Sequence, residues 1–324
     1  MDIPAFNPLF RNPHLQTIVG HYWPRPRIPG SYERRLFDTD TDVRVMVESN
    51  RPAEAAVGEI LLVHGLEGSS DAVYMRSVAG AAVRAGYAAH RLNLRTCGGT
   101  ENLCKTLYHA GLTSDVAAVI SQIQGDRGAP FFLVGFSLGG NVVLKFAGEL
   151  GANAEGLLAG VCAVSTPLDL AACVRRIGAR DNRVYENRFL SRMRKRMCAT
   201  GRYTARDFSG IRTLWDLDDR ITAPAFGFEG AAGYYRTQSA LPYLSRIRVP
   251  TLLIAAKDDT YIPAEIYQRP EIRGNPMVTV LETEHGGHLG FLGRGPRRFW
   301  LDHAILQWVR ILTVKEEAAR SSRF

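Results

Sequence analysis

The chain has 324 residues, of which 46% are hydrophobic and 22% are charged, and its formal net charge is +8. These proportions are those of ordinary globular proteins, so they exclude a disordered, collagen-like or fibrous chain. A chain of this length can bury a large core, and we expect one domain over residues 1–324. No run approaches the roughly 18 apolar residues of a membrane span. The start also lacks the apolar run of a signal peptide, so we expect a cytoplasmic location.

Apolar runs and helical patterns predict the elements in chain order. Two β-like runs, at residues 34–37 and 43–48, flank a turn and predict an antiparallel hairpin at a sheet edge. Short apolar runs then predict buried strands at residues 59–65, 87–94, 131–135, 157–164, 250–256 and 277–281. Apolar residues spaced three and four apart predict helices at residues 75–83, 116–123, 138–150 and 301–312.

This alternation determines the expected fold class. Strands that alternate with helices need crossover connections, which favour a parallel sheet. The fold class is therefore predicted to be α/β, with a mostly parallel central sheet flanked by helices. Residues 168–248 interrupt the alternation with arginine-rich, helical sequence, and we interpret them as a helical cap inserted over the sheet edge. Residues 315–324 are expected to form a flexible tail.

The five cysteines show no C-x-x-C spacing; they are Cys97, Cys104, Cys162, Cys173 and Cys198. An odd set without this spacing indicates neither a disulfide framework nor a zinc site. We expect these thiols to be buried or idle, because free cysteine behaves mostly as a small hydrophobic residue. The sequence therefore predicts no bound metal and no cofactor.

A Gly-x-Ser-x-Gly pattern, from Gly135 to Gly139, stands where a predicted strand meets a predicted helix. A serine nucleophile at the tip of such a turn needs small flanking residues, because the backbone there is tight. The helix that follows directs its N-terminus at the negative charge that develops during acyl transfer. This placement makes Ser137 the candidate nucleophile.

A serine hydroxyl needs an imidazole to take its proton and an acid to orient that imidazole. After this type of turn, the acid is expected behind a late strand and the histidine before the last helix. Asp258 and Asp259 follow the last strand but one, and His285 and His288 lie in a glycine-rich loop after the last strand. We favour Asp259, which stands four residues before a proline, and His288, which two glycines precede. Asp258 and His285 remain alternatives.

Two backbone amides are needed to bind an oxyanion. One is expected at Leu138, directly after the serine, and the other at Leu66, in the turn after the first buried strand. The position of His64 is fixed by the same turn, so we expect a structural role for it. Four aromatic residues of the cap segment are expected either to line an acyl pocket or to pack within the cap: Phe226, Phe228, Tyr234 and Tyr235.

Six segments, taken together, resemble the YheT-like branch of the α/β-hydrolases. They are Asn12-Pro-His-Leu-Gln-Thr-Ile18, His64-Gly-Leu-Glu-Gly68, Arg95-Thr-Cys-Gly-Gly99, Tyr108-His-Ala-Gly-Leu-Thr113, Gly135-Phe-Ser-Leu-Gly-Gly-Asn141 and Gly286-Gly-His-Leu-Gly-Phe291. The segments occur in order and span most of the chain. The resemblance implies an α/β-hydrolase fold and a serine esterase or lipase whose triad falls on Ser137, Asp259 and His288.

The predicted function is therefore a serine carboxylic ester hydrolase that acts through an acyl-serine intermediate. Its expected substrate is a short- to medium-chain acyl ester or lipid. An acyltransferase with the same triad is an alternative, since only the acceptor of the acyl group differs. A non-catalytic binding protein of the same fold is a second alternative, although binding alone would not require three chemical groups in register. The sequence does not identify the substrate.

Positive charge is concentrated in residues 175–206, where eleven basic residues stand against Asp181 and Glu186 and give +9, while the rest of the chain sums to −1. A helix here would place four apolar residues near one face: Phe189, Leu190, Met193 and Met197. Such a helix either packs this face on the domain or lies on an anionic membrane, and we keep peripheral membrane contact as a hypothesis. No nucleic-acid motif accompanies the basic run, so we expect no nucleic-acid partner.

Overall fold

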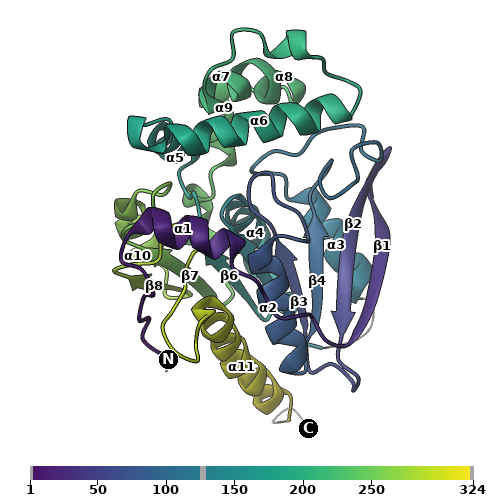
Figure 1. Ribbon diagram of the computed structural model, residues 1–324. Coiled ribbons are helices and arrows are strands. Elements are labelled where there is room, and N and C mark those ends of the chain that lie inside the picture. Colours follow the sequence, from purple (N-terminus) through teal and green to yellow (C-terminus); the bar gives the residue numbers. More distant parts are fainter. Residues whose placement is uncertain (1–2, 125–128, 322–324) are drawn as a thin grey trace.

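An eight-stranded sheet is the framework of the structure, a computed structural model that describes residues 3–124 and 129–321 (Figure 1). The strands stand in the order β1-β2-β4-β3-β5-β6-β7-β8. They are β1 (Ser31–Asp40), β2 (Val43–Arg51), β3 (Glu59–Val63), β4 (Ala88–Asn93), β5 (Phe131–Phe136), β6 (Gly160–Val164), β7 (Thr251–Ala256) and β8 (Val278–Thr283). In this order, neighbouring strands from β4 through β3 to β8 pair in parallel, whereas β2 pairs antiparallel with both β1 and β4.

Helices cover both faces of this sheet. Their bounds are α1 (Pro13–Tyr22), α2 (Val73–Arg84), α3 (Ser114–Gln124), α4 (Leu138–Leu150), α5 (Leu170–Ile177), α6 (Arg183–Ala199), α7 (Leu214–Leu217), α8 (Ala223–Ala225), α9 (Gly230–Gln238), α10 (Pro270–Arg273) and α11 (Trp300–Ser321). Apolar residues of α3 and α4 join a buried cluster on one face, and those of α2 and α11 join a cluster on the other. The predicted α/β class, with a mostly parallel sheet flanked by helices, is confirmed.

The central strands form where the sequence predicts them because both of their faces are covered. Every residue of β3 and β5 is buried, which explains why both strands are apolar apart from Glu59 at the start of β3. The hairpin at the edge is also confirmed, with Phe37 opposite Val45. The proline-rich start had no predicted element, yet it contains α1. Pro13 opens this helix, and the Asn12 side chain caps it by accepting a hydrogen bond from the Leu15 amide at 3.0 Å.

Between β6 and β7 the chain leaves the sheet for the residues that we call the cap, 168–248. This segment contains α5 to α9 and no strand. Figure 1 shows α5 to α9 as a layer beyond one end of the sheet, with α1 close by. The cap thus stands over the carboxyl ends of the parallel strands, the edge at which open α/β sheets bind their ligands.

The last helix is longer than the sequence pattern predicts. We expected a flexible tail from Lys315, but α11 continues to Ser321, and residues 322–324 lie outside the described part of the chain. The helical extension has a simple physical cause, because residues 315–321 are mainly Lys, Glu, Ala and Arg, which favour helix even without burial.

Candidate active site

Ser137 occupies the sharp turn between β5 and α4. Its backbone has φ 51° and ψ −122°, a conformation that side chains rarely adopt. Its amide donates a hydrogen bond to the Val164 carbonyl at 2.8 Å, which ties the turn to the neighbouring strand. A Cβ on Gly139 would lie 2.3 Å from the Val63 carbonyl oxygen, and one on Gly135 would lie 2.4 Å from the Gly139 carbonyl oxygen. The two glycines of the pattern therefore allow the close packing that holds the serine at the tip.

His288 and Asp259 complete a chain of hydrogen bonds from the serine. The Ser137 hydroxyl lies 2.9 Å from His288 Nε2. On the other side of the ring, His288 Nδ1 lies 3.0 Å from Asp259 Oδ2. The Asp259 carboxylate also accepts hydrogen bonds from the backbone amides of Tyr261 and Ile262, at 2.9 and 3.2 Å. The structure thus brings together the three residues that the sequence analysis favoured.

The two alternative residues form a separate pair. His285 Nδ1 lies 3.2 Å from Asp258 Oδ2, and Asp258 Oδ1 accepts a hydrogen bond from the Gly287 amide at 2.9 Å. The His285 side chain is 34% exposed, against 7% for the side chain of His288. The Asp258–His285 pair therefore supports the loop that carries His288 from its outer side.

The turn after β3 passes close to the serine. A Cβ on Gly65 would lie 3.0 Å from Ser137 Cβ, so only a glycine allows this approach. Leu66 follows it, and Leu66, Leu138 and Ser137 line the same cavity. Leu138 is also the first residue of α4, whose N-terminus carries a partial positive charge. Leu66 and Leu138, the two residues whose amides were expected to bind an oxyanion, thus both lie at the cavity that Ser137 lines.

His64, which precedes this turn, has a structural environment. Its side chain is fully buried, with Nδ1 2.8 Å from the Gly65 carbonyl oxygen, and Nε2 accepts a hydrogen bond from the Leu94 amide at 3.1 Å. Burial lowers the pKa of His64 to about 4, since the ring cannot be solvated as a cation. A neutral His64 therefore holds the turn to the neighbouring strand.

Helix α1 supports the histidine loop, a role that residue chemistry alone did not reveal. The Thr17 hydroxyl accepts a hydrogen bond from the His288 amide at 2.9 Å. Gln16 donates to the Leu292 carbonyl and accepts from the Leu292 amide, both at 3.0 Å. A Cβ on Gly20 would lie 2.8 Å from Gly290 Cα, so the helix and the loop are in backbone contact. The only sequence signal for this role was the first of the six family-like segments.

The cap is anchored beside the serine by a buried ion pair. Arg196 of α6 donates to Glu67 Oε1 at 2.8 Å, and the Tyr108 hydroxyl donates to the same oxygen at 3.0 Å. The guanidinium also stacks over the Tyr108 ring at 4.7 Å. Arg192 donates to the Glu67 carbonyl oxygen at 2.6 Å. Two arginines of the basic segment therefore fix the residue next to Leu66.

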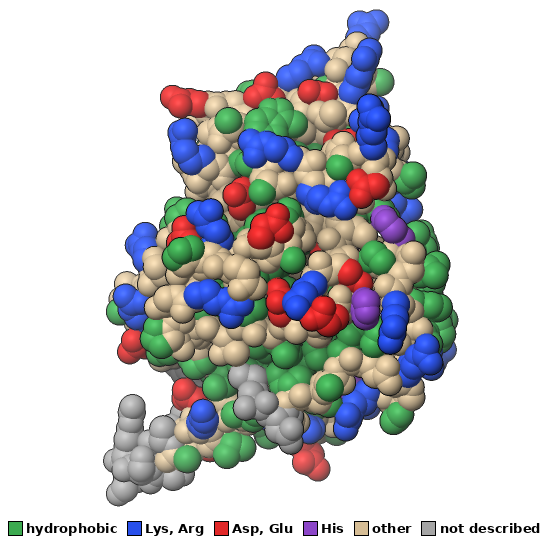
Figure 2. Space-filling view, turned by 90° about the vertical axis from the view of Figure 1, so that its left-hand side faces the viewer, with side chains coloured by type: hydrophobic (Ala, Val, Ile, Leu, Met, Phe, Trp, Pro, Cys, Tyr) green, Lys and Arg blue, Asp and Glu red, His purple; other side chains and the backbone are tan. Residues whose placement is uncertain are grey.

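The apolar face of α6 is not available to a membrane. Leu190, Met193 and Met197 are at most 6% exposed, and Phe189 is half-buried. Of the two arrangements that the amphipathic pattern allowed, the structure has the packed one, because these residues belong to the buried cluster under the cap. Figure 2 shows Lys and Arg side chains spread over the upper part of the molecule, with acidic side chains among them.

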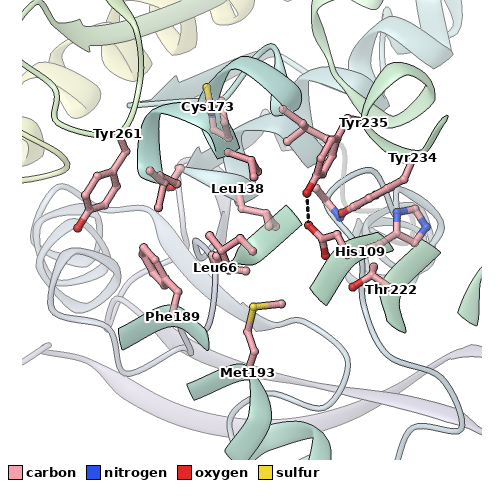
Figure 3. Close-up of a pocket in the computed structure, with 18 of the residues that line it drawn as sticks. Leu66, His109, Leu138, Cys173, Phe189, Met193, Thr222, Tyr234, Tyr235 and Tyr261 are labelled. Atoms are coloured by element: carbon pink, nitrogen blue, oxygen red, sulfur yellow. Dashed lines mark hydrogen bonds between the residues drawn. The ribbon is translucent and has the colours of Figure 1, made fainter. Parts of the chain in front are cut away.

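Ser137 lies at the junction of two hollows. The first, which we call the acyl cavity, lies under the cap and has an empty volume of about 780 Å³. Figure 3 shows its side chains, which come from α5, α6 and α9 and from the turns that carry Leu66 and Leu138. Of the four aromatic cap residues, Tyr234 and Tyr235 line it. Phe226 and Phe228 instead pack against the ring of His109, with centroids 4.6 and 5.4 Å apart.

The second hollow, which we call the groove, runs along the outside between α1, the turn after β3 and the start of α6. Both Ser137 and His288 line it, together with Ile18, Tyr22 and Arg188. Its lining differs from that of the acyl cavity, because it combines apolar with charged side chains. The reacting groups therefore lie between a mainly apolar cavity under the cap and a groove whose lining carries more charged side chains.

Three further kinds of feature concern the described residues: disulfides, metal sites and membrane spans. All five cysteines are free, and only Cys198 is not fully buried. Within residues 3–124 and 129–321, no group of three His, Cys, Asp or Glu side chains could hold a metal ion. The helices of the same residues include none that is both long and apolar enough to cross a bilayer.

Comparisons with known proteins agree with this geometry. Residues 60–299 match the model of a family described as the alpha/beta hydrolase family. The chain is 33% identical to the YheT protein of Escherichia coli strain K12, over 93% of this chain and 91% of that protein. It is 27% identical to human phospholipase ABHD3, over 94% of this chain and 72% of that protein. The resemblance expected from the six segments is confirmed.

Solved structures show the same fold. The esterase Pf2001 of Pyrococcus furiosus superposes with a TM-score of 0.58 and 18% sequence identity, covering 88% of this chain and 97% of that one. Est1E of Butyrivibrio proteoclasticus superposes with a TM-score of 0.57 and 12% identity, covering 87% and 99%. At these identities the similarity is one of fold.

Proposed function

The chain belongs to the alpha/beta hydrolase family, and we propose that it is a serine carboxylic ester hydrolase that works through an acyl-serine intermediate. One observation carries this proposal. The Ser137 hydroxyl, the His288 ring and the Asp259 carboxylate form one hydrogen-bonded chain that ends where the acyl cavity meets the groove. A nucleophile, a base and an orienting acid in this geometry are the groups that acyl transfer requires.

The roles follow from the positions of the atoms. His288 Nε2 takes the hydroxyl proton as Ser137 Oγ bonds to the acyl carbon, and Asp259 stabilises the resulting imidazolium. The amides of Leu66 and Leu138 hold the carbonyl oxygen as it becomes negative. His288 then protonates the leaving alcohol, whose bond to the acyl carbon breaks. In the second half, His288 takes a proton from water as the water oxygen bonds to the acyl carbon. The bond between that carbon and Ser137 Oγ then breaks, which releases the acid, and His288 returns the proton to Ser137.

A fluorophosphonate probe tests the nucleophile directly. We expect the probe to label the wild-type chain and to leave Ser137→Ala unlabelled. Ser69→Ala is a matched control, because Ser69 also lines the groove but stands outside the triad, and it should be labelled like the wild type. Labelling of Ser137→Ala, or no labelling of the wild type, would contradict the serine mechanism.

The substrate class follows from the two hollows. The acyl cavity is lined mainly by apolar side chains, which suits the hydrocarbon part of an ester. The groove then receives the alcohol part. Relatives of this chain include a yeast monoacylglycerol lipase, 26% identical over 94% of this chain, and human phospholipase ABHD3. We therefore propose a short- to medium-chain acyl ester or lipid as substrate.

Peripheral contact with an anionic membrane stays part of the proposal, on a different surface from the apolar face of α6. Ile18 and Tyr22 of α1 and Val184 of α6 line the groove and are 45%, 64% and 78% exposed. Arg188 and Arg192 lie beside them, and together with burial they lower the pKa of the neighbouring His21. Exposed apolar side chains with cations around the entrance to Ser137 suit a surface of anionic lipid.

Vesicle co-sedimentation at low salt tests this contact. We expect binding to vesicles that contain phosphatidylglycerol, weaker binding to phosphatidylcholine alone, and loss of binding as salt rises. Val184→Ser should weaken binding, whereas Val314→Ser, the same change at another exposed valine, on α11, should not. Equal binding to both kinds of vesicle, or none to either, would contradict the membrane contact but not the ester chemistry.

A further inference from the structure

A polar pair interrupts the apolar lining of the acyl cavity. The Tyr235 hydroxyl of α9 donates a hydrogen bond to Asp218 Oδ2 at 2.6 Å, and both residues line the cavity. Figure 3 draws this bond as a dashed line, with Thr222 on the same side of the cavity. Most of the other lining side chains are apolar, so the carboxyl group is an exception that the ester chemistry does not need.

The pair lies away from the reacting groups. Tyr261 marks the catalytic side, because its ring centroid lies 4.2 Å from that of His288. In Figure 3, Tyr261 stands at one side of the cavity and Tyr235 at the other, with Leu66 and Leu138 between them. An acyl group bonded to Ser137 beside these two leucines therefore has the Tyr235 side of the cavity available for its far end.

The Asp218 carboxyl group has one side-chain hydrogen bond, from Tyr235, and otherwise shares the cavity with mainly apolar side chains. Asp218 belongs to the cap and is half-buried, in agreement with its place in the cavity lining. Desolvation raises the pKa of this carboxyl to about 6, against the lowering effect of Tyr235 and Thr222. A carboxylate in such a space is destabilised unless a further donor reaches it. An alkyl chain has no donor to offer, whereas a hydroxyl group does.

Resting on the proposed ester hydrolysis, we propose that Asp218 and Tyr235 form a specificity site for a hydroxyl group on the distal part of the acyl chain. The preferred substrates are then esters of hydroxyalkanoic acids. The substrate hydroxyl donates a hydrogen bond to the Asp218 carboxylate. It requires no hydrogen-bond donor from the apolar walls of the cavity. An unsubstituted acyl chain of the same length leaves the carboxylate without this partner and binds less well. No bond other than the ester is made or broken.

Paired substrates test this site. We propose to measure kcat/KM for p-nitrophenyl esters of alkanoic acids with four to ten carbons and of the corresponding ω-hydroxy acids. A hydrogen bond to a charged group contributes about 1.5–3 kcal/mol, so the hydroxy ester should be favoured about tenfold to a hundredfold at the length that reaches Asp218. Taking the ratio of two esters cancels any change in the triad itself.

Variants then assign the preference to the pair. Asp218→Leu should bring the ratio to one or below. Tyr235→Phe removes the donor that Asp218 already has, so it should raise the ratio, and it keeps the test available if the leucine variant does not fold. Asp219→Asn is the matched control, because Asp219 is the neighbouring carboxylate but does not line the cavity, and it should keep the wild-type ratio. The inference would be overturned if the wild-type ratio equals one at every chain length. It would also be overturned if neither Asp218→Leu nor Tyr235→Phe changes the wild-type ratio.

Binding without turnover separates this inference from the proposed function. Calorimetry on Ser137→Ala with free hydroxyalkanoic acids and the matching alkanoic acids repeats the comparison in the absence of catalysis. Tighter binding of the hydroxy acid, lost in Ser137→Ala/Asp218→Leu, supports the specificity site even if no ester is hydrolysed. Hydrolysis of alkyl esters combined with equal binding of both acids would leave the ester hydrolase intact and remove the hydroxyl site.

Discussion

Two aspartate–histidine pairs lie next to each other in the site, and the sequence places all four residues in the correct loops. Residue types alone cannot decide between them, because Asp258 and His285 offer the same groups as Asp259 and His288. The difference lies in burial and direction. One pair reaches Ser137 from inside, and the other lies nearer the surface. The proline after Asp259 and the glycines before His288 indicated the inner pair, through the turns that such residues favour.

Single substitutions in the two pairs should separate their roles. His288→Ala and Asp259→Asn remove the base and its orienting acid, so we expect the kcat for a p-nitrophenyl ester to fall on the order of 10⁴-fold. His285→Ala and Asp258→Asn are the matched changes in the outer pair and should cost less than about tenfold. An inactive Asp258→Asn together with an active Asp259→Asn would reverse the assignment of the acid.

At the scale of elements, α1 shows where sequence reasoning ended. No element was predicted there, although Asn12 followed by a proline is a common helix start. The contact of α1 with the loop that carries His288 leaves no local pattern, since the loop lies more than 250 residues further along the chain. Local pattern reports which residues form a helix and says nothing about which distant loop the helix supports.

Thr17→Val tests this support. The change keeps the shape of the side chain but removes the acceptor of the His288 amide, and a buried amide without a partner costs about 1–3 kcal/mol. We expect a lower free energy of unfolding and a fall in kcat that exceeds the change in KM, because the imidazole is less well held. Thr17→Ser retains the hydroxyl and should behave like the wild type. Urea unfolding and ester kinetics of the two variants give the comparison, and equal kcat values would contradict it.

Helix α6 shows a second limit at the same scale. Its sequence indicated an apolar face and a basic face, but a packed helix and a membrane-bound helix share this pattern. The structure separates them through the partners of two arginines. Arg196 is buried and pairs with the Glu67 carboxylate, so its charge is used inside the protein, whereas Arg192 donates to the Glu67 carbonyl oxygen and stays exposed.

Replacing Arg196 should show how much its ion pair with Glu67 contributes to the free energy of unfolding. Arg196→Met leaves the Glu67 carboxylate buried without its cation, and breaking a buried pair in this way costs about 3–5 kcal/mol. The double variant with Glu67→Gln should recover much of that loss, because the two residues are in contact. Lys195→Met, at an exposed position of the same helix, should change the free energy of unfolding by less than about 0.5 kcal/mol. Urea titrations measure all three, and additive losses in the double variant would contradict the pairing.

At the scale of the whole molecule, the sheet was the most predictable part. Strands buried on both faces have continuous apolar sequence, and the helices between them imply parallel neighbours. The acyl cavity was the least predictable part. It is made by side chains from the cap and from two turns of the sheet edge, and their meeting depends on how the cap packs rather than on any local pattern.

A buried carboxyl group should couple the stability of the whole chain to pH. Asp302 of α11 accepts a hydrogen bond from Ser77 of α2 at 2.6 Å, and burial raises its pKa to about 6. The folded chain therefore holds this proton more tightly than the unfolded chain does. The free energy of unfolding should fall by about 3 kcal/mol from this group as pH rises from about 4 to about 6, and stay level above that.

Asp302→Asn should remove this part of the pH dependence, because the amide does not titrate but can still accept from Ser77. The measurement is the difference in urea unfolding between wild type and variant from pH 4 to 8. Asp71→Asn, a change at an exposed carboxylate, is the control and should leave the profile unchanged. A wild-type stability that rises with pH relative to Asp302→Asn would contradict the expected direction.

The position of Ser137 between the acyl cavity and the groove also sets an order of events. On the proposed mechanism, the alcohol departs along the groove while the acyl group is still bonded to the serine inside. Water, or a second alcohol that competes with it, arrives by the path that the first product has just left. An alcohol analogue held in the groove therefore prolongs the life of the acyl-enzyme, whereas an acid analogue that fills the cavity stops the reaction before it begins.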